Sequence, residues 1–235
     1  MKFSFDSRVR YSEIGEDRRL TLNGILNYFQ DCTTFHSEAA GVGMEFLEEK
    51  GQLWVLSSWQ IVVNRYPKMG EYIKISTWPY AFKRFMGSRN FTMESQEGEM
   101  LAYANSLWTY IDVKTGHPVN VGEEQIKVYE LEEKLDMDYA SRKVVLPQTA
   151  ETYPSFSVRP HHLDTNHHVN NGQYVLMAQE YLPSDFQVKQ MRAEYKRQAV
   201  LHDVIVPRVH REENLCTVVL ENLWGEIYTA VELKR

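Results

Sequence analysis

The chain has 235 residues, of which 43% are hydrophobic and 25% are charged. This composition is typical of a folded globular protein and excludes a fibrous or disordered chain. The formal net charge of −6 argues against nucleic acid as the main partner, because phosphate binding normally requires a basic surface.

The cysteine content and the absence of long apolar runs predict a cytoplasmic protein. Cys32 and Cys216 are the only two cysteines, so no disulfide framework is expected, and both fall at positions expected in the core. The sequence shows no secretory signal and no run of about 18 apolar residues, so we expect no membrane span.

The first predicted element is a helix over residues 20–40. Thr21 can cap its start, and Gly41 stands where the helix is expected to end. Apolar side chains fall at helical spacing on one face, namely Leu22, Ile25, Leu26, Phe29 and Cys32.

A run of antiparallel strands is predicted after this helix. The segments are rich in aromatic and β-branched residues, and turns with proline, glycine or charged residues separate them. They cover residues 53–64, 71–80, 85–95 and 100–113.

An acidic segment over residues 123–152 connects the two halves of the chain. Val128, Leu131 and Leu135 form a short apolar stripe that predicts a surface helix, although a solvated charged linker explains the same composition. We therefore assign this segment to neither domain.

The second half repeats the order of elements found in the first half. It is predicted to contain a short strand, a helix and four strands, over residues 153–158, 171–182, 190–198, 203–210, 214–221 and 225–233. We predict an α+β protein with two tandem domains, 1–122 and 153–235. Each is a long helix wrapped by an antiparallel β-sheet.

The polar stretch ahead of the second helix is the candidate active site. Asp164, Asn166 and His168 place a carboxylate, a carboxamide and an imidazole at every second residue. In an extended backbone alternate side chains point to the same face, so we expect the three groups to converge. Backbone N–H groups near Asn171 and Gly172, at the start of the helix, are expected to point to the same region.

Structural roles explain some of the same residues. Asp or Asn ahead of a helix is often a cap, which applies to Asn170 and Asn171 as well as to Asp164. The histidines at positions 161, 162, 167 and 168 suggest a metal site, but no helical metal-binding motif accompanies them. No nucleotide-binding loop is present either, so we expect neither a metal nor a cofactor.

The string Asp164-Thr-Asn166-His-His168-Val-Asn170-Asn171-Gly-Gln-Tyr174 resembles the signature of acyl-acyl-carrier-protein thioesterases, which are tandem hotdog proteins that release free fatty acids. Further similarity covers nearly the full chain. It includes Arg10-Tyr11-Ser12, Asn27-Tyr28-Phe29-Gln30-Asp31, Trp54-Val-Leu-Ser-Ser-Trp59 and Glu194-Tyr195-Lys196-Arg197.

The resemblance implies a bacterial-type cytoplasmic enzyme that hydrolyses the thioester of fatty acyl-acyl-carrier protein in fatty acid biosynthesis. It implies that Asp164, Asn166 and His168 are catalytic. Plant members carry a Glu-Cys pair where this chain has Gln198 and Ala199. A cysteine nucleophile is therefore impossible at that place. Gln198 replaces the family's glutamate, so Asp164 or His168 has to act as base.

Two mechanisms stay open from the sequence. Asp164 either activates a water molecule or attacks the carbonyl carbon itself, with His168 as the acid–base partner and Asn166 as the orienting group. In both mechanisms the N–H groups at Asn171 and Gly172 would bind the developing oxyanion.

The acyl chain requires an apolar slot, which we expect in domain 1–122 between the first helix and the strand over 53–64. The resemblance implies acyl carrier protein as the partner, and because that protein is acidic we expect a basic docking face. The candidate residues are Lys83, Arg84, Arg89, Arg142, Lys143, Lys189, Arg192, Lys196 and Arg197.

Alternative functions of the same fold also stay open. One is an acyl-coenzyme A thioesterase, and another is a non-hydrolytic acyl-binding or dehydratase-like protein. A dehydratase would need a carboxylate on one repeat facing a histidine on the other, for which His36 is the candidate. The sequence does not decide between a monomer and a homodimer.

Overall fold

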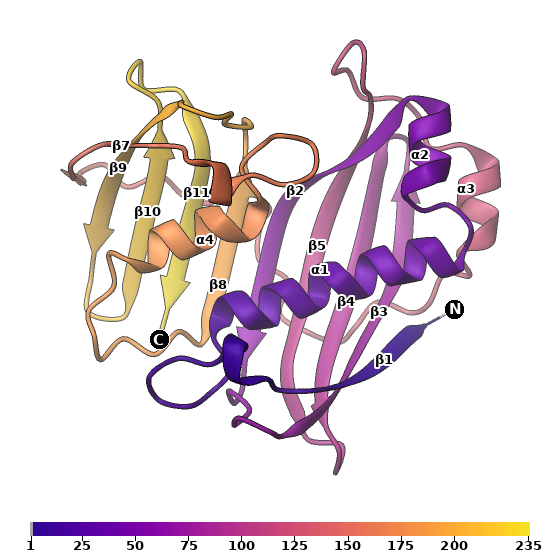
Figure 1. Ribbon diagram of the computed structural model, residues 1–235, viewed down its shortest axis with the longest axis horizontal. Helices are drawn as coiled ribbons and strands as arrows, with labels where there is room; N and C mark the ends of the chain where they lie inside the picture. Colours follow the sequence, from indigo (N-terminus) through magenta and orange to yellow (C-terminus); the bar gives the residue numbers. More distant parts are fainter. Residues whose placement is uncertain (1) are drawn as a thin grey trace. The chain divides into compact units, whose positions relative to one another are not determined.

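The computed structural model describes residues 2–235 and divides into two compact units (Figure 1). One unit contains residues 1–57 and 61–139, and the other contains residues 58–60 and 140–235. Each unit places one main helix on an antiparallel sheet, which is the tandem hotdog arrangement that the sequence predicts.

In the first unit, the predicted helix and all four predicted strands are confirmed. The sheet order is β1-β3-β4-β5-β2, and α2 is a helix that the sequence analysis did not predict. The elements are β1 (Phe3–Arg8), η1 (Tyr11–Glu13), α1 (Leu22–Ala39), α2 (Met44–Lys50), β2 (Gln52–Val63), β3 (Tyr72–Lys83), β4 (Met86–Ser95), β5 (Met100–Asp112) and α3 (Glu123–Val128).

Local signals fix both ends of α1. The Thr21 hydroxyl accepts a hydrogen bond from the Gly24 N–H at 3.0 Å, so it caps the helix as predicted. At the other end Gly41 has a φ of 71°, a left-handed conformation that glycine adopts without steric cost. Between these ends the predicted apolar face is buried, and the Phe29 ring packs on Phe91 of β4 at 5.2 Å.

The second unit is smaller. Its sheet order is β8-β11-β10-β9-β6, with β7 also paired to β9. The elements are β6 (Glu151–Thr152), β7 (Phe156–Ser157), η2 (Pro160–His162), α4 (Asn171–Gln179), β8 (Gln190–Tyr195), β9 (Val204–Arg211), β10 (Leu215–Glu221) and β11 (Ile227–Lys234).

The connecting segment is less helical than the apolar stripe predicts. Only α3 forms, and residues 129–150 contain neither helix nor strand. Leu131 is 49% exposed, so it buries little apolar surface to hold a helix. The Leu135 N–H instead donates to Asn90 Oδ1 of β4 at 3.1 Å.

Both cysteines belong to the core, as predicted. Cys32 and Cys216 are fully buried and carry free thiols. Burial raises the pKa of Cys32 to about 12, so its thiol stays protonated and unreactive at neutral pH. Within residues 2–235 no helix combines the length and the apolar character needed to cross a membrane.

A polar pair interrupts the apolar packing near the end of α1. His36 is 4% exposed, and its Nδ1 accepts a hydrogen bond from Arg89 Nη1 of β4 at 2.9 Å. Phe3 stacks on the imidazole at 5.4 Å. Burial, together with the positive charge of Arg89, lowers the pKa of His36 to about 3, so the ring stays neutral.

This depressed pKa predicts an acid-sensitive fold. In the unfolded chain His36 takes up a proton near pH 6.5, whereas in the folded chain it does so only near its pKa of about 3. The contribution of the neutral ring to the free energy of unfolding is therefore complete above pH 6.5 and falls as the pH decreases from 6.5 toward 3. We expect the wild type to lose about 2 kcal/mol more than His36→Gln between pH 7 and pH 5. Urea unfolding of both proteins at each pH measures this difference, and equal losses would contradict it.

Candidate functional site

The stretch that contains Asp164, Asn166 and His168 is a tight turn, and the extended backbone assumed for it is wrong. The Asp164 N–H donates to the His168 carbonyl at 2.8 Å, and the His167 N–H donates to the Asp164 carbonyl at 3.1 Å. His167 has a φ of 62°, which Asn, Asp and His tolerate better than most residues. The three residues are thus gathered by a turn and not by strand alternation.

The Asp164 carboxylate closes this turn. Its Oδ1 accepts hydrogen bonds from the backbone N–H groups of Asn166 at 2.8 Å and His168 at 3.2 Å. Such short side-chain-to-backbone bonds are the ordinary reason for Asp in a turn. Asp164 is half-buried, and within residues 2–235 no hydrogen bond engages its second oxygen.

His168 carries an unpaired polar atom. The ring nitrogen Nδ1 is buried and has no hydrogen-bond partner in the described part of the chain. The backbone of the same residue is held by pairing with Val200. Buried polar atoms are nearly always paired, and this nitrogen is one of several buried side-chain atoms of the described residues without a partner, Asn23 Oδ1 and Gln30 Oε1 among them.

No hydrogen bond joins the side chains of Asp164, Asn166 and His168 within residues 2–235. Asn166 is exposed, whereas the other two are half-buried. The structure therefore brings the three residues into one loop through the backbone, and in the described residues it leaves the Asn166 side-chain amide and His168 Nδ1 without hydrogen bonds.

The start of α4 differs from the expectation in one respect. Asn170 caps the helix by accepting a hydrogen bond from the Gly172 N–H at 2.8 Å. Because this bond already uses the Gly172 N–H, the prediction that this N–H is free to bind an oxyanion is wrong. The N–H of Asn171 makes no hydrogen bond in the described residues and keeps that role open.

Two tyrosines anchor the start of α4 to the segment after β8. The Tyr174 hydroxyl accepts from the Ala199 N–H at 2.8 Å, and the Tyr195 hydroxyl donates to the Asn171 carbonyl at 3.1 Å. Burial raises the pKa of both phenols, so both stay protonated. Gln198 is exposed and precedes buried Ala199, which leaves it outside the hydrogen bonds that shape the turn.

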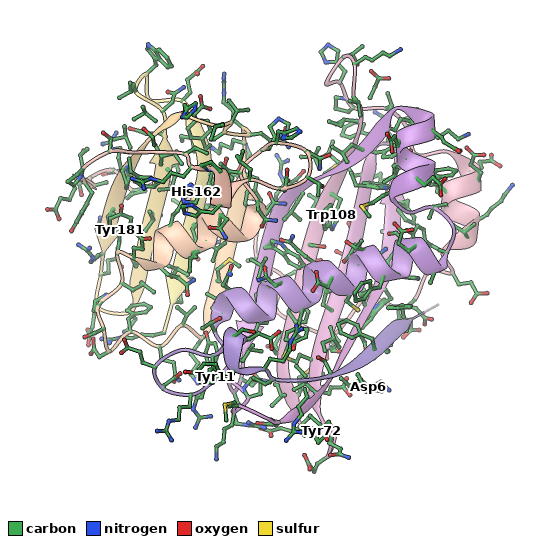
Figure 2. All side chains as sticks on the ribbon, in the orientation of Figure 1. Asp6, Tyr11, Tyr72, Trp108, His162 and Tyr181 are labelled. Atoms are coloured by element: carbon green, nitrogen blue, oxygen red, sulfur yellow. The ribbon has the colours of Figure 1, made fainter. Side chains whose placement is uncertain are left out.

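The neighbouring histidines have structural partners. His162, labelled in Figure 2, accepts a hydrogen bond from the Arg159 N–H on Nδ1 at 3.0 Å, and its ring lies 4.2 Å from that of His161. Burial and the two neighbours, His161 and Arg159, lower the pKa of His162. Among residues 2–235 no group of three histidine, cysteine or acidic side chains is arranged for a metal ion.

The same loop occurs ahead of α1, which strengthens the faint internal duplication seen in the sequence. There the Gly15 N–H donates to the Arg19 carbonyl at 2.9 Å, and the Arg18 N–H donates to Gly15 at 3.0 Å. Arg18 has a φ of 60°, matching His167. Gly15, Asp17 and Arg19 therefore stand where the second copy has Asp164, Asn166 and His168.

An apolar pocket lies in the first unit between α1 and β2, and Trp54 lines it, but the side chains of α1 that were expected to line a slot do not. Leu22, Ile25, Leu26 and Phe29 are at most 3% exposed and form packed core. The pocket has a free volume of about 160 Å³, far more than one water molecule needs. It lies along the second half of α1, and its walls include Thr33, Ser37, Leu47, Trp54, Phe82 and Trp108, the last labelled in Figure 2.

The basic residues named for docking fall into three groups. Arg89 is 6% exposed and Arg192 binds Glu232 at 3.1 Å with only 11% of its side chain exposed, so neither can form a docking face. Lys196 and Arg197 each face a glutamate within their own unit. The remaining candidates, all exposed, are Lys83, Arg84, Arg142, Lys143 and Lys189.

Strand alternation could have revealed the buried position of Arg89. Gly87, Arg89 and Phe91 alternate along β4 and so share one face, and that face also carries a core phenylalanine. By contrast, nothing in residues 164–168 distinguishes an extended segment from an Asp-closed turn before the hydrogen bonds are known.

Comparison with known proteins identifies the two halves separately. Residues 1–129 match the family model described as the acyl-ACP thioesterase N-terminal domain, and residues 146–234 match the acyl-ACP thioesterase C-terminal domain. The chain is 27% identical over 231 residues to a chloroplastic acyl-[acyl-carrier-protein] hydrolase of Cuphea viscosissima, covering 88% of this chain and 54% of that protein. The chain spans about half the length of the curated relatives it matches.

Solved structures show the same fold. An acyl-ACP thioesterase from Bacteroides thetaiotaomicron aligns with a TM-score of 0.90 at 21% identity, covering 99% of this chain and 97% of that one. A 12:0-ACP thioesterase from Umbellularia californica aligns with a TM-score of 0.88 at 20% identity, covering 99% and 96%.

Proposed function

This chain belongs to the acyl-ACP thioesterase family, and we propose that it hydrolyses the thioester bond of fatty acyl-acyl-carrier protein to release a free fatty acid. The observation that carries the proposal is the buried, unpartnered Nδ1 of His168, in the same turn as a carboxylate oxygen that makes no hydrogen bond in residues 2–235. A base and a carboxylate presented in this way suit attack on an activated carbonyl.

In this mechanism Asp164 and His168 share the chemistry. In one route Asp164 orients a water molecule, His168 takes a proton from it as it attacks the thioester carbon, and His168 then gives that proton to the leaving sulfur. In the other route Asp164 attacks the carbon and His168 gives a proton to the leaving sulfur; a water molecule then cleaves the acyl-aspartate, and its proton returns to His168. Both routes use the same two groups. Asn166, exposed at the corner of the turn, orients the nucleophile or the substrate through its carboxamide.

The oxyanion would be bound at the start of α4. The Asn171 N–H lies in the first turn of this helix, where the dipole favours negative charge. A single donor of this kind lowers a reaction barrier by roughly 3–4 kcal/mol. Gln198 carries no charge and cannot act as the base, so the glutamate that the plant members carry has no equivalent in this reaction.

The acyl chain would occupy the pocket of the first unit. Its apolar walls include Leu47, Leu53, Trp54 and Phe82, and each methylene buried there contributes about 0.8 kcal/mol. We propose Lys83 and Arg84 as the docking site for acyl carrier protein, because both are exposed and directly follow Phe82 of the pocket wall. The cytoplasm is the proposed compartment.

Replacing Asp164 separates its two roles. Asp164→Asn keeps an oxygen that can accept the hydrogen bonds from the Asn166 and His168 N–H groups, so we expect normal folding. It loses the negative charge, so we expect kcat to fall at least 100-fold, which is the size of effect that general acid–base groups contribute. Asp164→Ala also leaves two backbone donors without their acceptor, which costs about 1–3 kcal/mol of stability. Free fatty acid release and thermal melting measure both effects. An Asp164→Asn enzyme with full activity would remove the carboxylate from the mechanism.

Docking through charge predicts a substrate-dependent effect. In Lys83→Glu/Arg84→Glu we expect KM for acyl-carrier substrates to rise several-fold while KM for the matching acyl-coenzyme A ester changes less. Arg142→Glu/Lys143→Glu is the matched control, with the same charge change on an exposed pair in the second unit, and should leave both KM values unchanged. Equal effects of the two double variants, or a higher rate on coenzyme A esters in the wild type, would contradict this docking site.

A further inference from the structure

The wall of the pocket in the first unit holds a buried cation with no anionic partner. Arg89 is 6% exposed, and its Nη1 donates to His36 Nδ1 at 2.9 Å and to Thr77 Oγ1 at 3.3 Å. The guanidinium lies 5.3 Å from the centre of the Tyr129 ring. Within residues 2–235 no carboxylate contacts it, although it lines the pocket.

The sequence of β4 places this cation between two closely packed positions. Gly87 is two residues before Arg89 on the same face, and a Cβ atom there would lie 3.1 Å from Trp54 and 3.2 Å from Phe82. Two residues after Arg89, fully buried Phe91 fills the core. The rings of Trp54 and Phe82 therefore fill the space beside Gly87, and Arg89 stands between two packed positions on one face of the strand.

Three other polar side chains of the pocket wall already make hydrogen bonds within the protein. The hydroxyls of Thr33 and Ser37 donate to the backbone of their own helix, at 3.2 and 3.1 Å. Glu38 is exposed and accepts from the Met44 N–H at 2.8 Å, at the start of α2. His36 remains neutral, so it neither balances the charge of Arg89 nor adds to it.

An unpaired buried charge costs several kcal/mol, and burial lowers the pKa of Arg89 accordingly. A methyl group placed against the guanidinium would leave the free-energy cost of the unpaired charge unchanged. A carboxylate would relieve it, because a guanidinium has five N–H donors in a fork that fits two carboxylate oxygens.

We propose that this pocket binds a free fatty acid with its carboxylate inward on Arg89 and its alkyl chain along Leu53, Trp54 and Phe82. The remaining guanidinium donors bind the carboxylate oxygens, and the apolar walls cover the chain. This binding uses the same pocket that we propose for the acyl chain of the substrate. It goes beyond the proposed hydrolysis because it involves no thioester and none of the residues in the turn at 164–168. It gives the protein a site for the class of compound that the proposed reaction releases.

Calorimetric titration of the full chain with decanoate and 1-decanol, both below their aggregation limits at pH 8, tests the assignment. The two ligands share a chain and differ in charge. We expect the wild type to bind decanoate at least tenfold more tightly than the alcohol. In Arg89→Met the two affinities should differ by less than threefold, whereas exposed Arg142→Met should keep the wild-type ratio.

Two further measurements cover the case in which Arg89→Met does not fold. Arg89→Lys keeps the charge and should still prefer decanoate at least threefold. In the wild type, carbon-13 NMR of carboxyl-labelled decanoate should show a bound acid that protonates at a lower pH than the free acid. Equal affinity for the acid and the alcohol in the wild type, or a bound acid that protonates at the free value or above it, would overturn the proposal.

The result of these binding measurements can be separated from the result of the hydrolysis assays. Ligand binding is measured without any thioester, so a carboxylate preference would stand even for a protein that hydrolyses nothing. Conversely, normal hydrolysis without a carboxylate preference would reject this site and leave the proposed function intact.

Discussion

The hydrogen-bonded loop ahead of each main helix is the constraint on which the rest of this architecture depends. In the first copy the Thr21 N–H donates to the Glu13 carbonyl at 3.0 Å, and in the second the Asn170 N–H donates to the His162 carbonyl at 2.9 Å. Each bond places a capping side chain at the helix start. With the cap fixed, the helix begins at a set residue, and its buried face follows from the sequence.

The two copies use this loop for different purposes. In the first copy the turn carries Gly15 and Arg19, and the arginine donates to the Tyr66 carbonyl at 2.9 Å, which is a purely structural contact. In the second copy the equivalent positions carry Asp164 and His168, with a free carboxylate oxygen and an unpaired ring nitrogen among the described residues. The same backbone therefore holds a chemically inert turn once and a candidate active site once.

The parts of the structure that depend on local pattern could be predicted from the sequence. The run of apolar residues on α1 and the alternating strands β2 to β5 bury one face each, so periodicity identifies them. The parts that depend on long-range packing could not. α2 has only seven residues and no buried residue, and the segment through Leu131 and Leu135 stays irregular, with the Leu135 N–H bound to Asn90 of β4.

The candidate site shows the same division. The sequence predicts Asp164, Asn166 and His168 as candidate catalytic residues. The prediction that an extended backbone brings them together is wrong, because these residues lie in a turn that the Asp164 carboxylate closes. Likewise, Asn170 could be predicted as a cap, whereas the loss of the Gly172 donor to that cap depends on an exact distance. The spacing of residues in the sequence predicts which side chains lie in one loop. The hydrogen bonds determine which of their atoms remain without a partner.

The duplicated loop supplies the most direct test of the claim that the second turn carries the chemistry. The measurement is kcat for fatty acid release from an acyl-carrier thioester by His168→Gln beside Arg19→Gln, its counterpart in the first copy. We predict a fall of at least 100-fold for His168→Gln and no more than a few-fold for Arg19→Gln, with both proteins folded. Full activity in His168→Gln, or equal losses in the two variants, would contradict the account.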